Sequence, residues 1–351
     1  MKKLSIRDIG KELGVSITTV SFILNGKAKE KRISEALTKR VLDFVEKVNY
    51  TPNVMAQALR TGKSKLICLM VEDISNNFFF SQVARQIEEK AHINGYRVIF
   101  CSTDNDKNKT RELIKLFRDR LIDGYIITPP EGIEKQITNL LDDNIPVILA
   151  DRNLPDIQCS SVMVDNYESS FHATQHLIDQ GFEQIAYLAI ESTQTQMRDR
   201  QRGYEAAMNR SGKPILIKKL DYYAPQSENV AQLKSFMLAH PTLDAAFFAT
   251  NYICNWGLEV IRSLNLRIPQ DIGVLSYDDT SLFKLYNPSI TAVAQPIQQI
   301  SDNILKLMLD TLNGKFRAQD VHQVVIPAQL IVRESSIRNT LIPKDSTILT
   351  Q

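Results

Sequence analysis

The feature that most limits the fold of this chain is a series of short apolar runs that alternate with amphipathic segments from Leu66 onward. Ten runs have the length and composition of buried β-strands, and most segments between them have helical periodicity. Such alternation favours parallel sheets covered on both faces, and ten strands favour two sheets over one. The predicted strands are residues 66–71, 97–101, 124–128, 146–150, 161–164, 185–188, 216–219, 245–249, 272–276 and 290–294.

Polar side chains follow several of these runs directly. Ligands of parallel α/β sheets bind at the carboxyl ends of the strands, so these side chains predict a binding site. Asp and Asn hydrogen-bond to neighbouring hydroxyls, Arg binds paired oxygens or phosphate, and aromatic rings cover apolar sugar faces. A sugar, another polyol or a sugar phosphate is therefore the predicted ligand. The predicted site residues are Asp73, Phe78, Asp151, Arg152, Arg200, Tyr222, Asn251, Asp278 and Gln295.

The first 26 residues have a different pattern, that of two short helices joined by a tight turn. Ser5 and Asp8 have the spacing of a capping box, and Ser16 is placed to cap the second helix. Val20 and Leu24 are predicted to face inward. The alternative is an ordinary helical hairpin, but a helix that presents small polar and apolar groups suits the major groove of DNA. The predicted base contacts are Ile17, Thr18, Ser21 and Phe22.

Charge supports the nucleic-acid interpretation. Residues 1–65 hold 14 Lys and Arg against 6 Asp and Glu, a net charge of +8, whereas the whole chain carries only +2. A basic head on an acidic body is typical of a DNA-binding domain joined to a domain of another kind. A third helix is predicted to begin at Ser34. The predicted DNA phosphate contacts are Arg7, Thr19, Lys27, Lys29 and Arg32.

Asn53 is placed to cap one more short helix, which ends before Gly62. A helix of this length is not stable alone in water, so we predict a segment that orders and melts between two domains. The predicted organisation is a helix-turn-helix domain (1–52), a hinge helix (53–62), an α/β effector-binding and dimerisation domain (63–340) and a tail (341–351).

The chain also resembles the lactose-repressor (LacI) family of bacterial transcription regulators over residues 4–338. The head carries Ile6-Arg7-Asp8-Ile9, Gly14-Val15-Ser16, Thr19-Val20-Ser21, Leu24-Asn25-Gly26, Tyr50-Thr51-Pro52-Asn53 and residues 56–62. The body carries residues 73–79, Gly95-Tyr96, Asp123-Gly124, Asp151-Arg152, Asp165-Asn166, Arg200 with Gly203-Tyr204, and Tyr277-Asp278-Asp279.

The resemblance implies a homodimer that binds a double-stranded DNA operator, and a body with two subdomains and a cleft, similar to periplasmic sugar-binding proteins. It implies that the hinge orders on the operator, with Asn53, Ala56 and Leu59 at the minor groove, where Leu59 acts as an apolar wedge. The chain departs from the family at Asn77, where Pro is usual, and at Tyr252, where a second carboxylate is usual. Residues 23–29 and 292–295 look most like the fructose- and sucrose-responsive branch, so a fructose-related effector is expected.

Other functions are less well supported. The four cysteines form no C-x-x-C pair, no metal site or cofactor is predicted, and the absence of an export signal or membrane span favours the cytoplasm. Thr61-Gly62-Lys63-Ser64 fails as a phosphate loop because Gln57 replaces the required Gly. No catalytic residues are predicted. The alternatives are a regulator with a purine effector, a sugar-binding transport receptor, or a sugar enzyme.

Overall fold

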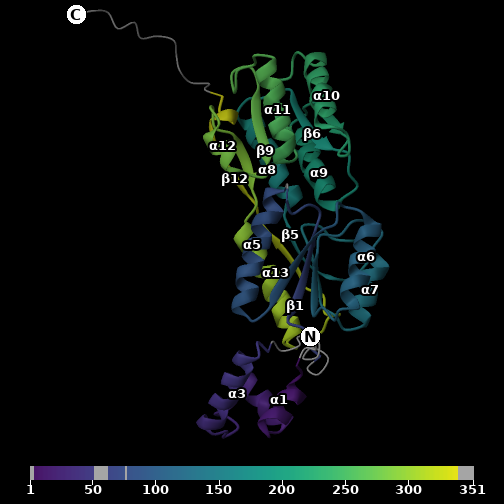
Figure 1. Ribbon diagram of the computed structural model, residues 1–351. Helices are drawn as coiled ribbons and strands as arrows, with labels where there is room; N and C mark the ends of the chain where they lie inside the picture. The colour runs from purple at the N-terminus through teal and green to yellow at the C-terminus, as the bar shows by residue number, and fades with distance from the viewer. Residues whose placement is uncertain (1–3, 51–61, 76, 339–351) are drawn as a thin grey trace, which may run out of the picture. The chain divides into compact units, whose positions relative to one another are not determined.

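The computed structural model describes residues 4–50, 62–75 and 77–338, and the chain divides into two units at Lys65 and Leu66 (Figure 1). The predicted hinge residues Asn53, Ala56 and Leu59 and the predicted tail, residues 341–351, lie outside the described residues. None of the helices in the described ranges is long and apolar enough to cross a membrane.

The N-terminal unit contains the three predicted helices, α1 (Ile6–Leu13), α2 (Ile17–Leu24) and α3 (Glu35–Lys47). Each begins at the predicted serine cap: the hydroxyl oxygens of Ser5, Ser16 and Ser34 accept hydrogen bonds from backbone N–H groups three residues on. The core consists of the fully buried side chains Ile9, Val20, Ile23 and Val41. The inward face of α2 therefore carries Ile23, while Leu24, predicted to face inward, is only partly buried.

The body contains two six-stranded sheets, which confirms the predicted fold class. The first has the order β11-β5-β4-β3-β1-β2, from strands Gln323–Ile326, Ser160–Val164, Val147–Ala150, Gly124–Ile127, Leu66–Val71 and Arg97–Ser102. The second has the order β12-β10-β9-β8-β6-β7, from strands Gln329–Ile331, Thr291–Ala294, Gly273–Tyr277, Ala245–Phe248, Ile185–Ile190 and Leu216–Leu220. Neighbouring strands are parallel except β10 and β12, which are antiparallel.

Helices cover both faces of each sheet (Figure 1). The first sheet packs against α5 (Phe78–Ile93) and α13 (Ile297–Leu312) on one face and against α6 (Lys107–Arg118) and α7 (Glu134–Asp142) on the other. The second packs against α10 (Gln226–Ala239), α11 (Asn251–Ser263) and α12 (Ser281–Leu285), and against α8 (Asn166–Asp179) and α9 (Thr195–Arg210). The inner strands of each sheet are buried on both faces, so their sequences are continuous apolar runs.

All ten predicted strands are present, but β11 and β12 were not predicted. They form the last two strands of the chain, one in each sheet, and the 3₁₀ turn Glu334–Ser336 follows them. The chain consequently passes between the two sheets three times, after β5, after β10 and after β11. At these crossings, the Asp165 carboxylate accepts a hydrogen bond from the Ala328 backbone N–H at 2.8 Å.

Candidate effector pocket and DNA-binding helix

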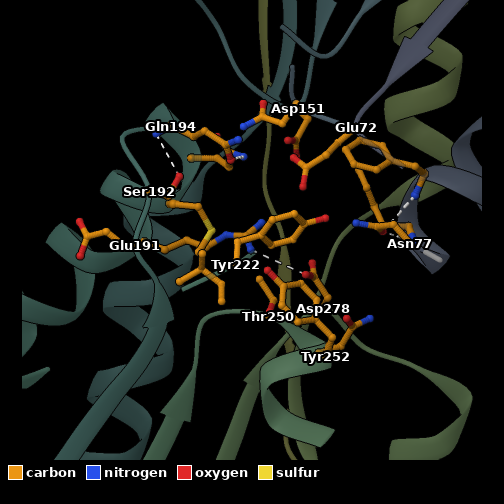
Figure 2. Close-up of a pocket in the computed structure, with 18 of the residues that line it drawn as sticks. Glu72, Asn77, Asp151, Glu191, Ser192, Gln194, Tyr222, Thr250, Tyr252 and Asp278 are labelled. Atoms are coloured by element: carbon orange, nitrogen blue, oxygen red, sulfur yellow. Dashed lines mark hydrogen bonds and ion pairs between the residues drawn. The ribbon is translucent and has the colours of Figure 1, made fainter. Parts of the chain in front are cut away.

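A cavity of about 280 Å³ lies at the carboxyl ends of strands from both sheets (Figure 2). Glu72 and Asp151 enter it directly after β1 and β4 of the first sheet. The second sheet contributes side chains that follow β7, β8, β9 and β10. These are Tyr222, Thr250, Asn251, Tyr252, Asp278 and Gln295.

The structure brings six of the nine predicted site residues into this pocket and leaves three outside it. The six are Asp151, Arg200, Tyr222, Asn251, Asp278 and Gln295. Asp73 instead accepts a hydrogen bond from the Ser75 backbone N–H at 2.8 Å within its own loop. Phe78 is 46% exposed at the start of α5. Arg152 is 2% exposed and lies behind Glu72, where its Nη2 contacts the Glu72 carboxylate at 2.8 Å.

Asn77, at the predicted departure from the family pattern, has a capping role. Its side-chain oxygen accepts hydrogen bonds from the backbone N–H groups of Phe79 at 3.0 Å and Phe80 at 3.4 Å, so it begins helix α5. Phe79 and Phe80 then line the pocket in place of Phe78. The aromatic contribution from this helix is therefore displaced by one and two residues from the prediction.

Arg200 is the guanidinium of the pocket, and its orientation is fixed from several sides. Its Nε donates to the Asn166 side-chain oxygen at 2.8 Å and its Nη1 to the Ala249 carbonyl at 2.9 Å. The guanidinium lies 3.6 Å from the centre of the Tyr277 ring, and its Nη1 lies 3.7 Å from the Asp278 carboxylate. A buried cation held in this way has little freedom to reorient, so it is a preorganised donor for a ligand.

Two of the glutamines that line the pocket have a buried side-chain oxygen without a hydrogen-bond partner among the described residues. The side-chain Nε2 of Gln295 donates to the Asp278 carboxylate at 2.6 Å, which leaves the buried Oε1 unpaired. The Oε1 of Gln196 is likewise buried and unpaired. Buried acceptors of this kind are costly unless water or a ligand supplies a donor, so they indicate a ligand with hydroxyl or N–H groups.

Two of the carboxylates are held by strained backbone. Asp151 has φ of 71° and Asp278 has φ of 68°, both in the left-handed region, immediately after their strands. Strain of this kind persists where the surrounding structure enforces it, often at ligand sites. Burial raises the pKa of the Asp151 carboxyl to about 6 against the opposing effect of Arg152 and Arg200, and the Asp278 and Glu72 charges raise it further.

Several pocket residues were not predicted. Glu72 is a polar residue directly after strand β1, which is the pattern that predicts a pocket residue, but the prediction names its neighbour Asp73. Gln196 and Met197 lie on helix α9, where nothing local marks them as ligand contacts. Tyr252, where the family usually has a carboxylate, lines the pocket, and its ring packs 6.5 Å from that of Tyr222.

Helix α2 presents the predicted DNA contacts to different extents. Ile17 is 43% exposed and Thr18 is exposed, whereas Ser21 and Phe22 are half-buried. The Lys31 ammonium lies 5.5 Å from the centre of the Phe22 ring. The accessible groups of this helix therefore concentrate in its first turn, as expected for a recognition helix that enters the groove with its N-terminal end.

The predicted phosphate contacts are mostly accessible to solvent. Arg7, Lys27, Lys29 and Arg32 are all exposed. Thr19 is half-buried, and its hydroxyl shares a 2.8 Å hydrogen bond with that of Ser16.

Gly10 allows the turn to approach α1 closely, because a Cβ at this position would lie 2.8 Å from the Val15 carbonyl oxygen. This close approach sets how the turn leads into α2.

A helix-turn-helix unit followed by a two-sheet body with a polar pocket at its strand ends defines the class of ligand-responsive DNA-binding regulators. Residues 5–53 match the model of the bacterial regulatory proteins of the lacI family, and residues 174–336 match that of the periplasmic binding protein-like domain. The HTH-type transcriptional regulator KdgR of Bacillus subtilis is 30% identical over 334 residues, 94% of this chain and 97% of that protein. The chain belongs to the lacI family and is a ligand-controlled DNA-binding transcription regulator.

Solved structures agree in fold. The lac repressor dimer bound to operator superposes with a TM-score of 0.82 at 22% identity, covering 96% of this chain and all of that one. A periplasmic binding protein/LacI transcriptional regulator from Alkaliphilus metalliredigens, complexed with D-xylulofuranose, has a TM-score of 0.69 at 25% identity, covering 78% of this chain and all of that one.

Proposed function

We propose that this regulator is a cytoplasmic homodimer that represses transcription from a pseudo-palindromic operator and that a sugar in the body pocket sets its operator affinity. The observation that carries the proposal is the presence of both parts in one chain: an exposed first turn on α2 and a pocket with unpaired buried acceptors. The proposed boundaries remain residues 1–52, 53–62 and 63–340.

The pocket chemistry supports a polyhydroxylated ligand. Glu72, Asp151 and Asp278 provide carboxylate acceptors and Arg200 provides a donor, while the rings of Tyr222 and Tyr252 provide apolar surface. The D-xylulofuranose bound by the Alkaliphilus regulator is a ligand of this kind. A fructose-related sugar is the first candidate, and a purine is the alternative.

The pocket is placed to act on the connection between the two sheets. Arg200 contacts Asn166, which begins helix α8 directly after the first crossing, and Gln295 lies in the second. A ligand that binds one arrangement of the sheets better than another shifts the population between them. We propose that this shift orders or melts residues 53–60, so that Leu59 enters the minor groove only in one state.

Selection of operators from random DNA with the full chain tests the DNA half of the proposal. The expected result is enrichment of sites with two-fold symmetry, because a dimer presents two recognition helices. Enrichment of asymmetric sites alone, or no enrichment, would contradict it.

A thermal-shift screen of the full chain with sugars, sugar phosphates and hypoxanthine tests the effector half. Binding to the native state raises the melting temperature by mass action. Hypoxanthine alone raising it would refute a sugar effector. Chemical conversion of a bound sugar during the assay would favour the enzyme alternative over the regulator.

A further inference from the structure

Glu72 is the pocket carboxylate for which neither the sequence nor the family comparison provides a role. It follows β1 in the first sheet and is 18% exposed, and its carboxylate contacts Arg152 at 2.8 Å. Arg152 is itself 2% exposed, and its Nη1 donates to the Asn105 side-chain oxygen at 3.4 Å. The buried arginine therefore fixes the Glu72 carboxylate from behind and leaves its other side toward the pocket.

Across the pocket, Tyr222 of the second sheet meets Glu72. Figure 2 shows Tyr222 between Glu72 and Asp151 on one side and Asp278 and Tyr252 on the other. Burial raises the pKa of the Tyr222 phenol to about 12, and the negative charge of the nearby Glu72 carboxylate adds to this effect. Tyr222 therefore lies beside Glu72 within the pocket, on the side from which a ligand hydroxyl would approach that carboxylate.

Burial raises the pKa of the Tyr252 phenol, and the charge of Glu72 raises it further. Tyr252 occupies the position at which the family usually has a carboxylate. Four carboxylates line the pocket, those of Glu72, Asp151, Glu191 and Asp278, against one guanidinium, that of Arg200. Glu191 is the most exposed of the four, with 69% of its side chain accessible.

We propose that Glu72 is a specificity-determining residue that accepts a hydrogen bond from a hydroxyl of an uncharged sugar, and that the Tyr222 hydroxyl holds this position across the pocket until the sugar displaces it. The inference rests on the proposed function and narrows it. A phosphate dianion would meet three carboxylates at close range, while the second guanidinium, Arg152, is already paired with Glu72. Phosphorylated sugars should consequently bind more weakly than their uncharged parent sugars.

Titration calorimetry on the full chain tests this with three matched pairs of probes: fructose and fructose 1-phosphate, glucose and glucose 6-phosphate, and ribose and ribose 5-phosphate. The variants are Glu72→Gln, which keeps the shape and removes the charge, and Tyr222→Phe, which keeps the ring. Glu183→Gln is the matched control, because Glu183 also pairs with a cation, Lys213, but is 67% exposed and lies outside the pocket.

We expect an uncharged sugar to bind and its phosphate ester to bind at least tenfold more weakly. Glu72→Gln should lower the affinity for the uncharged sugar by about 10- to 100-fold, which is the range for loss of a hydrogen bond to a charged group. Tyr222→Phe should strengthen it, because the internal competitor is gone, and Glu183→Gln should change it less than twofold. A phosphate ester that binds more tightly than its parent sugar, or equal effects of Glu72→Gln and Glu183→Gln, would overturn the proposal.

If none of the six probes binds, the proposed sugar effector is contradicted. The contact between Tyr222 and Glu72 is then tested separately, by a measurement without ligand. The melting temperatures of the wild type, Glu72→Gln, Tyr222→Phe and the double variant form a double-mutant cycle. A smaller effect of Tyr222→Phe in the Glu72→Gln background would support the contact across the pocket. Additive shifts would overturn it.

Discussion

The N-terminal unit and the body pocket are built on opposite principles. The N-terminal unit has a core of four fully buried side chains and presents its functional groups on the surface, within a segment of net charge +8. The pocket instead holds Asp151 and Arg200 away from water, each fixed by neighbouring groups. Recognition of DNA therefore depends on exposed charge, whereas recognition of the effector depends on buried, prearranged hydrogen bonds.

The largest expected difference between the two regions is in how their binding affinities depend on salt concentration. A dimer that neutralises six to ten phosphates loses about 10³- to 10⁵-fold in operator affinity between 50 and 200 mM salt. Binding of an uncharged effector in the pocket should change less than about threefold, because buried pairs are screened weakly. Fluorescence anisotropy for DNA and calorimetry for effector measure both. Equal salt dependence of the two would erase the contrast.

Removing the pocket guanidinium should have the next largest effect. Arg200→Ala leaves Asp278 without its cation and Asn166 without its donor. Because loss of one partner of a buried ion pair is strongly destabilising, we expect the free energy of unfolding to fall by about 3 to 5 kcal/mol. Denaturant unfolding of the full chain, followed by a body signal such as Trp256, measures the change. Arg202→Ala is the control, because Arg202 lies two residues away on the same helix but its side chain is 60% exposed.

Acidity should affect the body in a defined direction. The folded pKa of Asp151, about 6, is higher than its ordinary value of 3.8, so the native state binds more protons than the unfolded state between these values. The ligand-free body should therefore lose about 2 kcal/mol of stability as pH rises from 4 through 6. Asp151→Asn should reduce this dependence, as measured by unfolding at pH 4.5 and 7.5. An unchanged pH profile would contradict the assignment.

The smallest effects should come from single substitutions in the N-terminal unit. Ser16→Ala removes the cap of α2 and should cost about 1 kcal/mol in the stability of this unit, measured by its melting in circular dichroism.

Phe22→Ala should change which operators are preferred, whereas Lys29→Ala should weaken binding to all operators alike. The reverse outcome, with Lys29→Ala reordering the operators, would exchange the two assigned roles.

The N-terminal helices were predictable because their signals are local. Ser5, Ser16 and Ser34 act on backbone groups three residues away, so a short stretch of sequence contains the whole interaction. The strands of the body were predictable for a related reason, since burial on both faces requires a continuous apolar run. Strands β11 and β12 were not predicted because they are short and partly exposed at sheet edges, where burial does not require a long apolar run.

The pocket was only partly predictable because adjacent residues at the end of a strand point into different surroundings. Glu72 enters the pocket and Asp73 does not, although both follow the same strand. Asp151 enters it, while Arg152 turns behind Glu72. Gln196 reaches the pocket from a helix, and only the packing of that helix against the second sheet brings it there. Strand ends locate such a site, but tertiary contacts select its members.

The three passages between the sheets have a consequence for synthesis of the chain. Strand β11 pairs with β5, about 160 residues earlier, and β12 pairs with β10, so the edge of each sheet is formed by residues near the end of the described chain. Neither sheet corresponds to one continuous stretch that folds as it leaves the ribosome. Because domains generally fold as units during translation, both halves of the body must wait for residues 323–331. A message truncated even slightly before this point yields two unfinished sheets and no functional half.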